Sequence, residues 1–71
     1  MTELSKLEKE IIEFLADSGN QLFDWIVEVF KGKGYCEKEI VEALEWLLLR
    51  GTLYYFNGHV DLAWEFEKLR G

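Results

Sequence analysis

Residues 50–62 read RGTLYYFNGHVDL. Two short runs of strand-forming residues flank the dipeptide Asn57-Gly58 in this stretch. Asn-Gly is the strongest short signal for a two-residue type I′ hairpin turn, because both turn positions need a positive φ. The stretch therefore predicts a two-stranded antiparallel hairpin over about residues 52–62.

The turn fixes the register of the hairpin, and the register assigns each side chain to a face. Phe56 is then predicted to lie opposite His59, and Leu53 opposite Leu62. Because neighbouring residues in a strand point to opposite faces, one face is predicted to pack on the core and the other to point outward. The predicted core face holds Leu53, Tyr55, Val60 and Leu62. The predicted outer face holds Tyr54, Phe56, His59 and Asp61.

Three helices are predicted upstream of the hairpin, because apolar residues recur there at the three-and-four spacing of an amphipathic helix. Glycine-containing breaks divide this region into helices over about residues 5–17, 21–31 and 36–50. The first helix begins with the capping-box pattern of Ser5 and Glu8.

The second and third helices differ in their start signals and in their apolar surface. Asn20 is expected to cap the second helix, whose apolar residues cover so much of its circumference that it should be largely buried. The third helix has capping-box spacing with Cys36 at the N-cap, where a thiol is a poorer acceptor than a hydroxyl. Its predicted buried face consists of Ile40, Leu44, Leu47 and Leu48.

The chain has 71 residues, so residues 1–71 are expected to form a single domain. Its one cysteine excludes an intrachain disulfide. No apolar run approaches the roughly 20 residues of a membrane span, and the N-terminus does not read as a signal peptide. A cytoplasmic location and no membrane partner are therefore expected. Residues 63–70 are a candidate for a short terminal helix, with Trp64 and Phe66 as its anchors.

The predicted order of elements, three helices and then a hairpin directly after a glycine, is that of the winged-helix superfamily. Residues 40–47 (IVEALEWL) and 50–55 (RGTLYY) resemble the apolar recognition helix, basic-glycine step and first wing strand of that family. The resemblance covers roughly residues 5–64. It implies an α+β fold, a three-helix winged helix-turn-helix with a C-terminal two-stranded β-hairpin wing. Winged helices bind DNA, RNA and proteins, so the resemblance implies binding without naming the ligand.

Two winged-helix subfamilies are similar to parts of the chain. Z-DNA-binding winged helices present an Asn and a Tyr from the recognition helix, but the aligned positions here are Val41 and Glu45, which removes both contacts. The small dissimilatory sulfite reductase D protein family resembles the chain in size, acidity and layout, and in residues 38–40 and 52–55. That family is a stand-alone winged helix tied to a sulfite-reducing enzyme rather than to a promoter.

Catalytic and metal chemistry have few candidate residues in this sequence. Cys36 is the only thiol and His59 the only imidazole, and the predicted topology separates the start of a helix from the tip of the hairpin. A zinc site needs three or four ligands, which one Cys and one His do not supply. We therefore expect no enzyme activity, no metal and no cofactor.

DNA binding is the alternative function, and charge is the argument against it. The net charge is −6, whereas affinity for DNA phosphates comes from Lys and Arg. The outer face of the third helix is predicted to carry Lys38, Glu42, Glu45 and Leu49, so two carboxylates would face the phosphates. A DNA-binding transcriptional regulator would have to use the cations Lys31, Lys33, Lys38 and Arg50.

Protein binding fits the predicted surface better, because aromatic residues are typical anchors of protein interfaces. The chain is therefore expected to be a protein-binding regulator or adaptor. The candidate protein-binding residues are Trp46, Leu49, Tyr54 and Phe56. For Trp25, Trp46 and Phe56 the alternative is an ordinary core role beneath the C-terminal segment. A homodimer formed through the outer hairpin strand is a third option, since an edge strand can pair with another chain.

Overall fold

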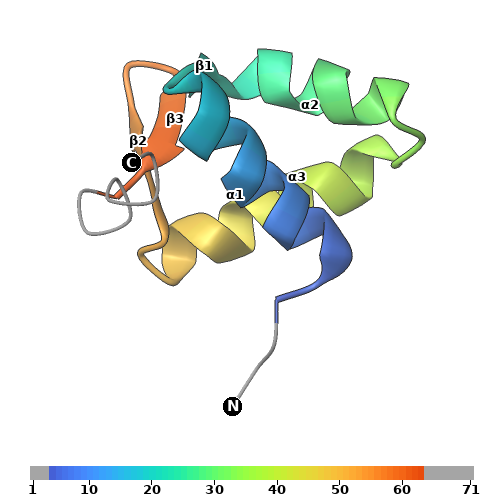
Figure 1. The fold of residues 1–71 in the computed structure, drawn as a ribbon, viewed down its shortest axis with the longest axis horizontal. Coiled ribbons are helices and arrows are strands. Elements are labelled where there is room, and N and C mark those ends of the chain that lie inside the picture. The colour runs from blue at the N-terminus through green and yellow to red at the C-terminus, as the bar shows by residue number, and fades with distance from the viewer. Residues whose placement is uncertain (1–3, 64–71) are drawn as a thin grey trace.

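The computed structural model describes residues 4–63, and in this part of the chain three helices precede a hairpin (Figure 1). The predicted α+β arrangement, three helices with a C-terminal hairpin wing, is confirmed. The candidate terminal helix with Trp64 and Phe66 lies outside the described residues. The elements are α1 (Lys6–Ser18), β1 (Gln21–Leu22), α2 (Phe23–Gly32), α3 (Glu37–Leu49), β2 (Leu53–Phe56) and β3 (His59–Leu62).

The sheet has three strands in the order β1-β3-β2, so a third strand that the sequence analysis did not predict joins the two strands of the predicted hairpin. The short strand β1 pairs Gln21 with Val60 and Leu22 with His59. The Phe23 N–H continues this pairing by donating to the Gly58 carbonyl at 2.9 Å. Helix α2 consequently begins at Phe23 rather than at residue 21, with Leu22 instead of Asn20 at the N-cap. The edge of β3 supplies backbone hydrogen-bond partners that hold residues 21 and 22 in an extended conformation. The local sequence around these residues gives no sign of that pairing.

The predicted hairpin register is confirmed at all four pairs, from Leu53 opposite Leu62 to Phe56 opposite His59. The turn residues Asn57 and Gly58 have φ values of 52° and 79°. Both lie in the left-handed region that a type I′ turn requires.

Two residues of the hairpin do not follow the predicted division into a core face and an outer face. Leu53, Val60 and Leu62 are buried as expected. Tyr55, assigned to the core face, is 56% exposed, because it lies near the turn, where its ring forms an edge-to-face pair with Phe23 at the start of α2, with centroids 6.2 Å apart. Asp61, assigned to the outer face, is 5% exposed, and its Oδ1 accepts a hydrogen bond from the Leu62 N–H at 2.7 Å.

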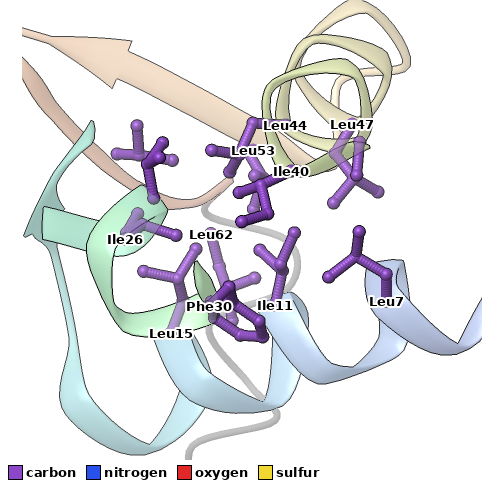
Figure 2. Packing of buried hydrophobic residues seen from close by; sticks show 13 residues of the cluster. Leu7, Ile11, Leu15, Ile26, Phe30, Ile40, Leu44, Leu47, Leu53 and Leu62 are labelled. Carbon is purple, nitrogen blue, oxygen red and sulfur yellow. The ribbon is translucent and has the colours of Figure 1, made fainter. Parts of the chain in front are cut away.

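The hydrophobic core lies where the three helices meet the hairpin (Figure 2). Helix α3 contributes four buried residues, among which Ala43 takes the place predicted for the half-buried Leu48. Helix α2 is less buried than predicted, since three of its ten residues, Ile26, Val27 and Phe30, are buried. The buried apolar residues are Leu7, Ile11, Leu15, Ile26, Val27, Phe30, Ile40, Ala43, Leu44, Leu47, Leu53, Val60 and Leu62.

Helices α1 and α3 begin with capping interactions at the positions that the sequence predicts. In α1, the Glu8 N–H donates to Ser5 Oγ at 3.1 Å, and the Ser5 N–H donates to Glu8 Oε1 at 2.8 Å. In α3, the Cys36 N–H donates to Glu39 Oε1 at 3.2 Å. Cys36 has the extended backbone of an N-cap residue, with φ −83° and ψ 154°.

The substitution Cys36→Ser should stabilise the protein. The hydroxyl is a stronger acceptor for the N–H groups of the first turn of α3 than the thiol is, and the backbone conformation already suits a cap. We expect the free energy of unfolding to rise by about 0.5–1 kcal/mol in urea titrations. Cys36→Ala is the control, because it removes the thiol without supplying an acceptor, and it should not stabilise. Equal stability of the Ser and Ala variants would contradict this role for residue 36.

Candidate interaction surface

Large apolar side chains are exposed on both the hairpin and the helices. Four of them are the residues that the sequence marks for protein binding: Trp46 is 44% exposed, Leu49 77%, Tyr54 46% and Phe56 67%. The other exposed large hydrophobic residues within the described part of the chain are Leu22, Trp25 and Tyr55. Aromatic residues at this exposure offer contact area to a partner at a small cost in side-chain entropy.

Tyr54 and Phe56 lie on the outer face of the hairpin, where alternation along β2 places them side by side. They line a shallow surface hollow of about 250 Å³ together with polar residues of β3 and of the α1–β1 connection. The hairpin tip holds one of these polar residues in place, since His59 Nδ1 lies 3.1 Å from the Asn57 carbonyl oxygen. An apolar centre with a polar rim is typical of protein interfaces.

Trp46 and Leu49 lie one helical turn apart on the C-terminal half of α3. The guanidinium of Arg50 lies over the Trp46 ring, 6.0 Å from its centroid. Trp46 also borders a wider hollow of about 620 Å³ between α3 and the start of α1, whose lining includes Glu39 and Glu42. The exposed part of α3 therefore combines an aromatic side chain with carboxylates.

A third exposed apolar site, formed by Leu22, Phe23 and Tyr55, was missed by the sequence analysis. These side chains line a hollow of about 290 Å³ where β1, the start of α2 and the hairpin meet. The sequence pattern predicted Leu22 within a buried helix and Tyr55 on the core face of the hairpin. The short distance of Tyr55 from the turn, only two residues, could have indicated its exposure, because the tip of a hairpin often extends beyond the helices that cover the rest of the sheet.

Most of the candidate DNA-binding cations already contact other groups of the chain. Lys31 at the end of α2 lies 3.6 Å from both Glu28 and Glu37. Lys33 lies over the ring of Phe30, 5.7 Å from its centroid. Arg50 follows α3 and lies over Trp46, as described above. Lys38 is exposed in the first turn of α3 and forms no ion pair or cation–π contact with residues 4–63.

The groups considered for catalysis occupy separate elements. Cys36 is an exposed thiol at the start of α3, and His59 is exposed on β3. Within residues 4–63, no three His, Cys, Asp or Glu side chains are grouped so that they could hold a metal ion. Tyr35 donates to Glu10 Oε2 at 3.1 Å, and burial together with this hydrogen bond raises the pKa of its phenol.

The same part of the chain contains no helix that is long and apolar enough to cross a membrane.

The comparisons of the chain with known protein families, curated proteins and solved structures gave no match. The fold of residues 4–63 defines an α+β class, three helices followed by a hairpin wing.

Proposed function

We propose that this chain is a non-enzymatic interaction module of the winged-helix type. It binds another protein through Trp46, Leu49, Tyr54 and Phe56. The observation that carries the proposal is the exposure of these four large apolar side chains on α3 and on the outer face of the hairpin. Residues of this kind provide most of the binding energy where they enter a partner's pocket. The chain acts as a regulator or adaptor in the cytoplasm, where its single thiol stays reduced.

The charge distribution supports a protein partner over DNA. Glu42 and Glu45 are exposed on the face of α3 that would have to enter a groove, and phosphates would repel them. Lys31 is already close to two carboxylates, which lowers the positive potential that it offers to a phosphate. The sequence resemblance to the dissimilatory sulfite reductase D family also favours a protein partner, because that family is tied to a sulfite-reducing enzyme rather than to a promoter.

The proposal is tested by capturing partners from native extract with the full chain, with and without nuclease, and then titrating the purified partner. We expect a defined protein that survives nuclease treatment. Replacing Trp46, Tyr54 or Phe56 by Ala should weaken its binding by about 2 kcal/mol at the hot spot, a factor of roughly 30 in Kd. Trp25→Ala is the matched control, since it removes an aromatic ring of similar exposure from α2 and should leave the affinity unchanged.

Two results would contradict protein binding through these residues. One is full partner binding by a Trp46/Tyr54/Phe56 triple Ala variant that remains folded by circular dichroism. The other is duplex DNA binding near micromolar Kd at about 0.15 M salt that disappears when Lys31, Lys33 and Lys38 are changed to Glu. The second result would instead support the DNA-binding regulator.

A further inference from the structure

Strand β2 lies at the edge of the sheet. In the strand order β1-β3-β2, the central strand β3 is paired on both sides, whereas β2 is paired with β3 alone among the described residues. Figure 1 shows the hairpin at one end of the molecule, beyond the helices. An edge strand presents backbone N–H and C=O groups that can pair with another chain.

The hydrogen-bond pattern identifies which backbone groups of β2 point away from β3. The Ala63 N–H donates to the Thr52 carbonyl at 3.0 Å, so the pair formed by these two residues is hydrogen-bonded. Antiparallel pairs alternate, and the groups of Tyr54 therefore also point toward β3. Those of Leu53 and Tyr55 point in the opposite direction, to the outer edge of the sheet.

Within the described residues, β2 lacks the charges, the proline and the bulge that commonly keep edge strands apart. Residues 51–58 contain no charged residue and no proline. The pairing of β2 with β3 is continuous over all four positions, without a bulge. Proteins usually protect an edge with lysine, proline or a bulge, and β2 instead carries Leu53 followed by three aromatic residues.

We propose that β2 pairs antiparallel with β2 of a second copy of this chain. The two-fold axis passes beside Tyr54, so that Leu53 of one copy lies opposite Tyr55 of the other. This register uses every outward N–H and C=O of Leu53 and Tyr55 and forms about four backbone hydrogen bonds. It joins the two hairpins into one continuous sheet and brings the outer faces with Tyr54 and Phe56 together.

A second copy suits this edge because the self-pairing brings no charges together. In the antiparallel register, Thr52 lies opposite Phe56 of the second copy, and Arg50 opposite Gly58. The net charge of −6 comes from residues outside the paired segment 51–58, and at about 0.15 M salt exposed charges more than ~8 Å apart repel each other only weakly. The proposal does not depend on the binding of another protein, because its test measures only the association of the chain with itself.

The register is tested by disulfide cross-linking of the full chain in a Cys36→Ser background. Tyr54→Cys places two thiols at a non-hydrogen-bonded antiparallel pair, where the Cα atoms are ~4.5 Å apart and a disulfide can form. Oxidised glutathione should convert this variant to a covalent dimer. Phe56→Cys is the control on the same face, because its two thiols would be roughly 13 Å apart in this register. It should remain monomeric on non-reducing gels.

The backbone contact is tested separately by sedimentation equilibrium. Tyr55→Pro removes the N–H that points to the outer edge, and it leaves every hydrogen bond between β2 and β3 in place. Tyr55→Ala removes the same aromatic ring but keeps the N–H. We expect the dimer dissociation constant of the Pro variant to be about tenfold or more above that of the Ala variant. A wild-type chain that is monomeric at all concentrations would overturn the proposal. So would equal dimerisation of a folded Pro variant and the Ala variant, or equal cross-linking at positions 54 and 56.

Discussion

Replacing Leu44 by Ala should destabilise the protein by about 2–5 kcal/mol. Leu44 is fully buried at the centre of α3, within the cluster that joins the helices to the hairpin (Figure 2). The substitution loses the transfer free energy of the removed carbons and leaves a cavity that the neighbouring side chains fill only in part. A domain of this length is stable by roughly 4–10 kcal/mol, so the loss takes a large share of the total.

The same substitution on the opposite side of α3 provides the control. Leu49 is 77% exposed, so Leu49→Ala should change the free energy of unfolding by no more than about 0.5 kcal/mol. Urea titrations of both variants followed by tryptophan fluorescence measure the difference. If Leu44→Ala cost less than about 1 kcal/mol, or if the two variants were equally destabilised, α3 would not bury the face described here.

Replacing Gly58 by Val should disrupt the hairpin. Gly58 has φ 79°, in the left-handed region that costs an L-residue about 1–2 kcal/mol and a β-branched residue more. Space is not the obstacle, since a Cβ at this position would meet only Leu22 Cδ2, at 3.9 Å. The Gly58 carbonyl also accepts from the Phe23 N–H, so a distorted turn would weaken the β1 pairing as well. We expect a destabilisation of about 2 kcal/mol or more in urea titrations.

Gly32→Ala is the matched control for the turn. Gly32 ends α2 with no positive φ and with no atom within 4 Å of an added Cβ. Alanine there should be neutral or should stabilise by up to about 1 kcal/mol, because it restricts the unfolded chain. Gly58→Val stability within about 0.5 kcal/mol of the wild type would show that the type I′ turn does not hold the hairpin in register.

The local patterns of the sequence determined the elements whose causes lie within a few residues. Asn57-Gly58 predicted the turn and with it the register of β2 and β3, because only a few residue types accept two successive positive φ values. Ser5 and Glu8 predicted the start of α1, because a capping box is formed by side chains three residues apart. Helical spacing predicted Ile40, Leu44 and Leu47 as core residues of α3.

The four candidate protein-binding residues could also be predicted from local sequence patterns. The sequence marked Trp46, Leu49, Tyr54 and Phe56 as outward-facing, and all four side chains are exposed. Strand alternation and helical periodicity were sufficient here, because both depend only on position within an element. Whether a partner binds these residues stays a prediction.

Only the tertiary structure decided the features that depend on distant segments. Gln21 and Leu22 form a strand instead of a helical turn because β3, almost forty residues later, offers them an unpaired edge. Tyr55 is exposed although alternation assigned it to the core, because the helices within residues 4–63 leave its ring largely uncovered beside Phe23. Strand alternation predicts the face of the sheet on which a side chain lies. Burial also requires that another helix or strand pack against that face, and the position of that element depends on the packing of the whole chain.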